Sequence, residues 1–485
     1  SGSGSANYSS ILIKPTGGAA RIISGAATAG LPLIDLNGAD NVTVDGLNTG
    51  GNSLTIDNIT ISSTSGTSTL RLQGDATNNL FTNVSINGAS TMGSTTNGGN
   101  VWIGAGAITT GNDNNQFQSC KFGPSTAGLP TKTFYGNGST TSTTTYNSNI
   151  TINNCEFFDY FNASTQSNGI YVAGANADWI ISNNKFYQTA ARTQTSGTVH
   201  ASIQLASTNI NNCLISGNVI GYSANNATGT YTFNGLASTR FYGIYISNLG
   251  TTSTTTVQNN TITAISLSGA FSGTSTSGPF FGIYLVGLSD AKNNTIGSLD
   301  NSTNISISST STSTGEVYGI YNFSSSFTNI SDNKIGSITV TNNTTGSSIF
   351  CGIRLNTASG QAATVSNNII GGTTTNSINN TATATSSRII GIQNDLPFAT
   401  ITNNIIRNFT MSAPNVGTGT SASVIGILQS ATSTSGNHLI SSNTIHTLKN
   451  TNASSAVWVT GINATGPTST KIGRASCRER VSSPV

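Results

Sequence analysis

Ile181-Ser182-Asn183-Asn184-Lys185-Phe186 spells apolar-x-polar-Asn-x-apolar, and this pattern returns about every three dozen residues through the chain. The steps between copies range from roughly 29 to 42 residues, while the local spelling stays constant. Constant units at variable spacing indicate stacked supersecondary units joined by loops of different length. The fourth position of successive copies holds Cys120, Cys155, Asn184, Asn218, Asn260, Asn294, Asn333, Asn368, Asn404 and Asn443.

A second pattern, Gly-Ile, precedes most copies, as in Gly243-Ile244-Tyr245-Ile246 and Gly282-Ile283-Tyr284-Leu285. A Ser/Thr/Gly-rich excursion follows the Asn segment, for example Gly269 to Gly278 or Ser306 to Gly315. Period-2 alternation and β-branched residues mark strands, and no window shows a helical period. A unit with this many strands and so few residues fits one coil of a parallel β-helix, so the sequence predicts an all-β solenoid of about a dozen coils.

The Gly-Ile-Tyr-Leu and Asn-Asn-x-Ile spellings resemble the right-handed parallel β-helix repeats of the pectate-lyase-like superfamily over nearly all of residues 33 to 465. The stretch Asn41 to Asn48 and the Ser/Thr/Asn-rich coils resemble large secreted surface proteins of Bacteroidetes-type bacteria. The first resemblance implies a single-stranded, right-handed parallel β-helix and directs attention to polysaccharide lyase or glycoside hydrolase sites.

Three segments are expected: residues 1–32 as a lead-in strand or partial coil, 33–465 as the β-helix, and 466–485 as a tail. The tail lacks the repeat and is rich in charge, and it resembles adapter or vector read-through; a native basic sorting tail is the alternative. Residues 471–485 are predicted to lack packed contact with the solenoid. Because the chain opens with neither Met nor an apolar signal segment, it is expected to be part of a longer product.

Charge excludes some classes of function. Charged residues are 7% of the chain, and the net charge of +3 comes from the last segment: without Lys471, Arg474, Arg478, Arg480 and Glu479, 14 basic and 14 acidic residues remain. Nucleic-acid binding requires clustered cations, so nucleic acid is not an expected partner. No apolar run reaches the ~20 residues of a membrane span. An extracellular or cell-surface location is expected.

The Asn position is predicted to face inward, because earlier copies place Ile59 and Val84 there and the next two copies place Cys. Asn tolerates the left-handed conformation at a bend, and stacked amides can hydrogen-bond from coil to coil. A structural ladder is therefore favoured over a row of ligand-binding amides.

Period 2 in the Gly-Ile strand sends the Ile inward and the following residue outward. An aromatic and planar polar column at one-strand intervals could stack on sugar faces and bind hydroxyl or carboxylate groups of a polysaccharide. The alternative is that these rings only steady the sheet by stacking on one another. The column consists of Tyr171, Gln204, Tyr245, Tyr284, Tyr321, Arg354 and Gln393.

Catalytic and metal motifs are not spelled in the sequence. Val101-Trp102-Ile103 continues with Gly104 and Ala105 where the resembled pectate-lyase motif has Asp and His. No aligned pair of carboxylates is evident, and the three His lie in unrelated contexts, so no catalytic residue, metal or cofactor is predicted. The four Cys of the body have no C-x-x-C spacing and are predicted to be free, buried thiols.

These patterns favour a non-enzymatic structural or adhesin segment, with polysaccharide or other surface proteins as partners. A polysaccharide lyase or glycoside hydrolase is the alternative, and two or three carboxylates, or an Arg beside a carboxylate cluster, in one groove would favour it. Fold alone does not decide between them.

Overall fold

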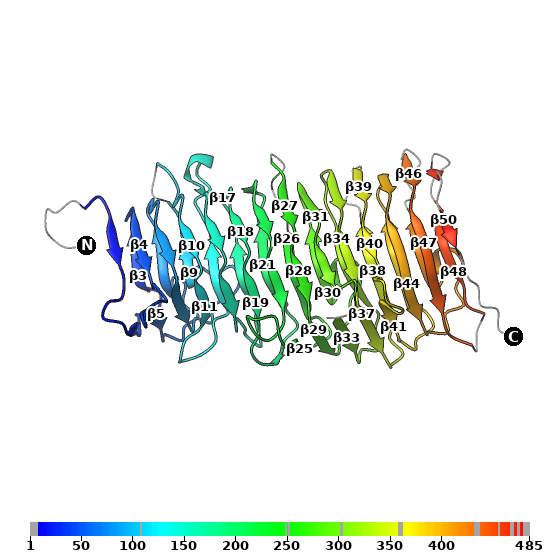
Figure 1. Ribbon diagram of the computed structural model, residues 1–485, viewed down its shortest axis with the longest axis horizontal. Helices are drawn as coiled ribbons and strands as arrows, with labels where there is room; N and C mark the ends of the chain where they lie inside the picture. The colour runs from blue at the N-terminus through cyan, green and yellow to red at the C-terminus, as the bar shows by residue number, and fades with distance from the viewer. Residues whose placement is uncertain are drawn as a thin grey trace. The chain divides into compact units, whose positions relative to one another are not determined.

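The structure is a computed structural model that describes residues 8–106, 109–247, 250, 253–300, 304–356, 362–430, 437–453, 456–465, 470–472 and 476–478. It is an all-β parallel solenoid of about 12 turns with almost no helix, which confirms the predicted fold class. Figure 1 shows the strands of each unit in stacked coils and gives their labels. No helix within the described ranges has the length and apolar character that a membrane crossing requires.

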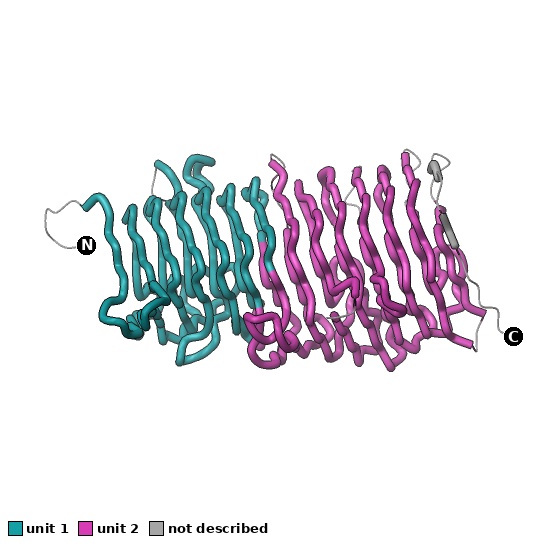
Figure 2. Tube along the Cα trace, in the orientation of Figure 1, with its two compact units in different colours: residues 1–162, 166–186, 205–218 teal, residues 163–165, 187–204, 219–485 magenta. Residues whose placement is uncertain are grey.

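The chain divides into two compact units, coloured teal and magenta in Figure 2. The first holds residues 1–162, 166–186 and 205–218, and the second holds residues 163–165, 187–204 and 219–485. In each unit the coils contribute to three parallel sheets, called here sheets 1, 2 and 3.

The first unit contains short strands in every coil. Its sheet 1 consists of β1 (Ile11–Ile13), β4 (Val42–Asp45), β7 (Leu80–Thr82), β10 (Gln116–Gln118), β14 (Thr151–Asn153), β18 (Ile180–Ser182) and β23 (Leu214–Ser216). Its sheet 2 consists of β2 (Ala20–Gly25), β5 (Ser53–Asn58), β8 (Val84–Gly88), β11 (Lys121–Pro124), β15 (Glu156–Phe158) and β19 (Lys185–Tyr187). Its sheet 3 consists of β3 (Pro32–Asn37), β6 (Ser68–Gln73), β9 (Gly99–Ile103), β12 (Lys132–Gly136) and β16 (Ser167–Val172). A small sheet and one 3-10 turn complete it: β13 (Asn147–Ser148), β17 (Asn176–Ala177), β22 (Ile210–Asn211) and η1 (Thr143–Thr145).

The second unit repeats this plan with longer sheet 3 strands. Its sheet 1 consists of β27 (Thr255–Gln258), β31 (Ser289–Lys292), β35 (Thr328–Ser331), β39 (Ala362–Ser366), β43 (Phe398–Thr402), β46 (His438–Ser441) and β49 (Thr470–Ile472). Its sheet 3 consists of β21 (Val199–Ala206), β26 (Arg240–Ser247), β30 (Phe280–Leu285), β34 (Gly315–Asn322), β38 (Ser348–Leu355), β42 (Arg388–Asn394), β45 (Val424–Gln429) and β48 (Val459–Ala464).

Sheet 2 of the second unit has two runs of strands. The first run consists of β24 (Val219–Gly221), β28 (Thr261–Thr263), β32 (Thr295–Gly297), β36 (Lys334–Gly336) and β40 (Ile369–Ile370), and the second of β20 (Arg192–Thr193), β25 (Tyr231–Gly235), β29 (Ile265–Gly269), β33 (Ile305–Ser309), β37 (Ile338–Asn342) and β41 (Ile378–Asn380). The two runs join in β44 (Ile405–Met411), which pairs with both, and continue in β47 (Thr444–Asn450) and β50 (Ser476–Arg478). Two 3-10 turns are η2 (Ser275–Ser277) and η3 (Gly419–Ser421).

The core is built from columns of identical residues. In the second unit, one column on sheet 2 pairs Ile262, Ile296, Ile335, Ile370, Ile406 and Ile445 from turn to turn. Each of these side chains is at most 2% exposed. Stacking a branched residue on its copy removes both from water and contributes about 1.5–3 kcal/mol for each buried side chain.

The Gly of the Gly-Ile pattern lies at a step in sheet 3. Register pairs Phe281 with Tyr318 and Ile283 with Ile320, and the glycines between them make no pair. A Cβ on Gly282 would lie 2.6 Å from the carbonyl oxygen of Gly319 and 2.8 Å from Ile296. Only Gly fits where backbone approaches this closely, which explains its recurrence.

Two expectations about the loops and the tail are wrong. The excursion Ser306 to Gly315 begins inside a strand, because Ile305 and Ile307 alternate inward with Ser306 and Ser308 between them. In the tail, β49 pairs with β46 and β50 pairs with β47, so residues 470–472 and 476–478 continue the backbone ladder instead of lacking contact. The rest of the prediction for 471–485, at residues 473–475 and 479–485, lies outside the described residues. The backbone can add such strands whatever the side chains, because an exposed strand edge offers unpaired N–H and C=O groups.

Candidate functional site

The predicted outward column is present as a row on sheet 3 but is mostly covered. In the second unit Tyr245, Tyr284, Tyr321, Arg354 and Gln393 occupy one register position on successive strands. Tyr284 and Tyr321 stack with ring centroids 5.2 Å apart. Four members of the column are less than a tenth exposed and three are partly exposed. The covered four are Tyr171, Gln204, Tyr284 and Tyr321, and the partly exposed three are Tyr245, Arg354 and Gln393.

A second outward column lies beside it, and the sequence reasoning missed it. Strict period 2 from Ile283 sends Phe281 inward, but the step at Gly282 turns both Phe281 and Tyr284 outward. The second column packs against the first in an apolar cluster, with Phe281 and Tyr318 stacked at 5.1 Å. Its residues are Tyr242, Phe281, Tyr318, Cys351, Ile390 and Ile425.

The excursion containing η2 covers part of this outer face. The Ser275 hydroxyl lies 2.9 Å from the Tyr321 hydroxyl, and its backbone N–H donates to Glu316 Oε2 at 2.6 Å. Asn356 Nδ2 donates to both hydroxyls, at 2.6 Å to Tyr321 and 3.0 Å to Ser275. The turn is therefore held at a fixed place over the aromatic cluster.

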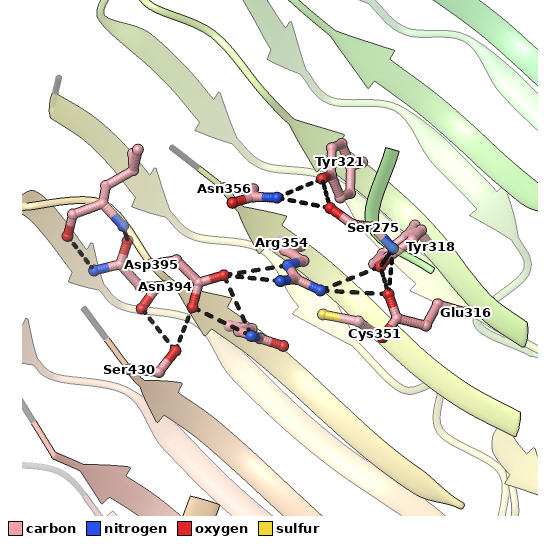
Figure 3. A network of polar contacts seen from close by, with 12 residues as sticks. Ser275, Glu316, Tyr318, Tyr321, Cys351, Arg354, Asn356, Asn394, Asp395 and Ser430 are labelled. Carbon is pink, nitrogen blue, oxygen red and sulfur yellow. Dashed lines mark hydrogen bonds and ion pairs between the residues drawn. The ribbon is translucent and has the colours of Figure 1, made fainter. Parts of the chain in front are cut away.

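Arg354 joins two carboxylates at the edge of this cover (Figure 3). Its Nη1 lies 3.4 Å from Glu316 Oε2, and its Nη2 and Nε lie 3.1 and 3.2 Å from Asp395 Oδ2. The three side chains are between 12% and 19% exposed. Pairs this well shielded interact more strongly than surface ion pairs, and removing one partner leaves a charge without compensation.

The two carboxylates are not equivalent. Both oxygens of Asp395 accept hydrogen bonds: Gln393 Nε2 donates to both, the Ser430 hydroxyl donates to Oδ1, and Arg354 donates to Oδ2. Glu316 Oε2 accepts from the Ser275 N–H, the Tyr318 hydroxyl and Arg354. Glu316 Oε1 accepts no hydrogen bond from the residues that the structure describes. Asp395 thus holds Arg354 in place, whereas Glu316 Oε1 is left open, that is, without a hydrogen-bond donor among the described residues.

Protonation states follow from this arrangement. Burial raises the pKa of Tyr318, and the neighbouring Glu316 carboxylate raises it further, so the phenol stays protonated and donates. Burial alone would lower the pKa of Arg354, but Tyr318, Asp395 and Glu316 outweigh it, so its pKa is raised and the guanidinium stays charged. The site thus presents a fixed cation beside one open carboxylate oxygen.

No pair of carboxylates aligned at one register is evident in the sequence, and the structure joins two unaligned carboxylates through Arg354 instead. Glu316 and Asp395 lie at different positions of their repeats, and the long Arg354 side chain on the strand between them reaches both. Positions can be counted from the repeat Gly of each coil. Glu316 lies three residues before Gly319, Arg354 lies two after Gly352, and Asp395 lies four after Gly391. Aligning the charged residues on that Gly would have shown that they share one face.

The Asn column is occupied by its own hydrogen bonds. In the second unit each Nδ2 from Asn260 to Asn404 donates to Oδ1 of the next Asn at 2.9 Å. In the first unit Asn184 Nδ2 donates to Asn218 Oδ1 at 3.0 Å, and Asn184 Oδ1 accepts from the Cys155 N–H at 2.8 Å. These are the contacts of a structural ladder. Leu54, which pairs with Val84, occupies the position assigned to Ile59, and Ile59 is 37% exposed.

Cysteines and histidines stay outside this chemistry. Cys120, Cys155, Cys213 and Cys351 are free and buried, which confirms the prediction. His200 is buried against Tyr231 in the second unit, and burial together with Arg192 lowers its pKa to about 3, so it is neutral. No cluster of three or more His, Cys, Asp or Glu that could hold a metal is found within the described ranges.

Comparisons with known proteins give only remote similarity. No protein-family model matches the chain, and no curated protein matches it in sequence. Among solved structures, it is similar to the periplasmic alginate epimerase AlgG at 12% identity and a TM-score of 0.32, covering 93% of this chain and 78% of that one. The A-module of the Azotobacter vinelandii mannuronan C-5 epimerase AlgE6 has 12% identity and a TM-score of 0.30, with coverage of 97% and 91%. Similarity at this level carries no conclusion about activity.

Proposed function

We propose that the second unit is a polysaccharide lyase whose substrate lies over the outer face of sheet 3, with Glu316 as the base. The observation that carries this proposal is the asymmetric carboxylate pair: Glu316 has one oxygen pinned and one open, beside a permanently charged Arg354. An Arg between two carboxylates is the arrangement that favours an enzyme over a structural segment. The adhesin interpretation finds no support in these contacts.

The chemistry assigned to the site is β-elimination from a uronic acid residue. Glu316 Oε1 takes the proton from the carbon next to the sugar carboxylate, the glycosidic C–O bond breaks, and a C=C bond forms. The proton that Glu316 has gained passes to the leaving oxygen. Arg354 stabilises the negative charge that develops at the sugar carboxylate, and Asp395 holds Arg354 in place.

A glycoside hydrolase is less compatible with these contacts. That reaction uses two carboxyl groups that both act directly on the bond or on a water molecule. Both oxygens of Asp395 are engaged by Gln393, Ser430 and Arg354. A polymer substrate is in keeping with an extracellular or periplasmic location, which is part of this proposal.

The test is elimination activity against a panel of uronic acid polymers, followed by the ultraviolet absorbance of the unsaturated product. Glu316→Gln keeps the shape of the side chain and is expected to lower kcat by about 10²- to 10⁴-fold, the usual contribution of a general base. Asp290→Asn is the control, because Asp290 pairs with Lys292 at 2.8 Å on sheet 1 and belongs to no part of the site.

Two results would contradict the proposal. One is full activity of the Glu316→Gln variant. The other is tight binding of a polymer by the wild-type protein without any cleavage, which would return the chain to the class of binding proteins.

A further inference from the structure

A cavity of about 440 Å³ lies next to the charged site within the second unit. Six of the ten described residues that line it carry hydroxyl or amide side chains, among them Thr314, Ser347, Ser386 and Asn415, and Arg388 is the charged residue among those ten. The volume falls within the range of about 300–1,000 Å³ that small-molecule sites occupy.

Arg388 brings unused donors to this cavity. Its Nη1 donates to the carbonyl oxygen of Thr420 at 2.7 Å, and no other hydrogen bond of its guanidinium is found among the described residues. Burial lowers the pKa of Arg388 and Arg354 adds to this, while Glu316 and Tyr318 act in the opposite sense. Among the described residues that line the cavity there is no carboxylate. A partly dehydrated cation facing hydroxyl groups favours an anion that also carries hydroxyls.

We propose that this cavity is a binding subsite for a uronic acid residue, with Arg388 pairing to the sugar carboxylate and the Ser and Thr hydroxyls bonding to the sugar hydroxyls. The choice of a uronic acid rests on the proposed lyase function. The anionic character of the ligand rests on the cavity itself.

The register places this subsite at a defined distance from the reacting group. Glu316, Ile349 and Arg388 occupy one row on β34, β38 and β42. Two strand spacings separate the first from the last, which is roughly 10 Å along the row. A polysaccharide lying across these strands would then place one sugar at Glu316 and another in the cavity.

The experiment measures access to Arg388 directly. The full chain is treated with phenylglyoxal in buffer, in D-glucuronate or in D-glucose, and modified arginines are mapped by mass spectrometry. Arg388 is expected to react in buffer and in glucose and to be protected by glucuronate. Arg407 is the matched control, since its Nε donates to one backbone carbonyl, Gly371, at 3.3 Å and it lies on sheet 2 outside the cavity. Its reactivity is expected to be the same in all three solutions.

A second readout uses the polymer found in the lyase assay. Arg388→Gln is expected to raise KM about tenfold, a loss of about 1.4 kcal/mol of binding, with little change in kcat, because the subsite binds ground state and transition state alike. Arg388→Lys, which keeps the positive charge, is expected to recover part of the affinity.

The outcomes separate this inference from the lyase proposal. Protection of Arg388 by glucuronate in a protein without lyase activity would leave the subsite standing and remove the reaction. Glu316-dependent cleavage with an unprotected Arg388 and an unchanged KM in Arg388→Gln would overturn the subsite. An Arg388 that does not react even in buffer is closed to ligands, and this result would also overturn it.

Discussion

Lys132 in the first unit and Arg354 in the second are both cations held against sheet 3 under a covering loop, yet their partners differ. Lys132 Nζ donates to three backbone carbonyls, those of Gly93 at 3.1 Å, Ser94 at 2.7 Å and Thr96 at 2.5 Å. It also lies 3.8 Å from the centroid of the Tyr135 ring. Its partners are thus dipoles and a ring face, which can bind a cation but offer no group for acid–base chemistry.

Arg354 instead meets two carboxylates, a phenol and, through Glu316, the backbone of the covering turn. The comparison shows that a buried cation on this face is not by itself a sign of a site. Around Lys132 the cation fastens a loop. Around Arg354 the same kind of cover leaves one carboxylate oxygen open, and this is the feature that can do chemistry.

The largest expected effect comes from removing Arg354. Arg354→Gln leaves Glu316 and Asp395 shielded from water without their cation, and we expect a loss of about 3 kcal/mol in the free energy of unfolding. Lyase activity is expected to fall with it. Unfolding in urea followed by circular dichroism gives the first quantity.

A double variant tests whether the pairing is the cause of that loss. Glu316→Gln combined with Arg354→Gln is expected to lose less stability than the sum of the two single variants. In the double variant Asp395 still lacks its cation, but position 316 no longer carries a charge. Additive losses would show that Arg354 and Glu316 do not stabilise each other, and the distinction from Lys132 would disappear.

The sequence predicts the solenoid well because the residues that pack from coil to coil recur at the same position of each repeat. Asn294, Asn333 and Asn368 recur because each amide bonds to the next, and Gly282 and Gly319 recur because backbone passes too close for a Cβ. The charged site cannot be predicted in the same way. It depends on the long side chain of Arg354 reaching two neighbouring coils, and within the described residues this contact does not recur from coil to coil, so no repeat signals it.

Lys132 fastens the loop of residues 93–96 in the first unit. Lys132→Met keeps the apolar stem and removes three donors to residues 93–96, and we expect a loss of about 2 kcal/mol. Amide hydrogen exchange in residues 92–97 should quicken, while lyase activity should stay unchanged.

Lys121→Met is the matched control for this variant. The Lys121 side chain is 46% exposed and pairs with Glu156 at 3.4 Å, so its loss is expected to cost well under 1 kcal/mol. A change in activity on replacing Lys132 would show that this cation also serves the site and does more than fasten the loop.

The smallest expected effect is a difference between Lys132 and Arg354 in how their contribution to folding stability depends on pH. Burial lowers the pKa of Lys132 to about 7, whereas in the unfolded chain the amine titrates near 10.4. Between pH 7 and 8.5 the unfolded chain therefore binds more protons, and wild-type stability should rise relative to Lys132→Met by about 1.5 kcal/mol. The absolute stability of both proteins falls at higher pH, because burial raises the pKa of Cys213 and Cys351 to about 12 and the unfolded thiols lose protons first, but this fall is common to the two proteins and leaves their difference unchanged. Arg354 stays charged throughout, so the difference between wild type and Arg354→Gln should not change over this range. If the stability difference between wild type and Lys132→Met also does not change with pH, the three carbonyls keep the Lys132 ammonium charged in spite of burial. Both cations would then stay charged over this range.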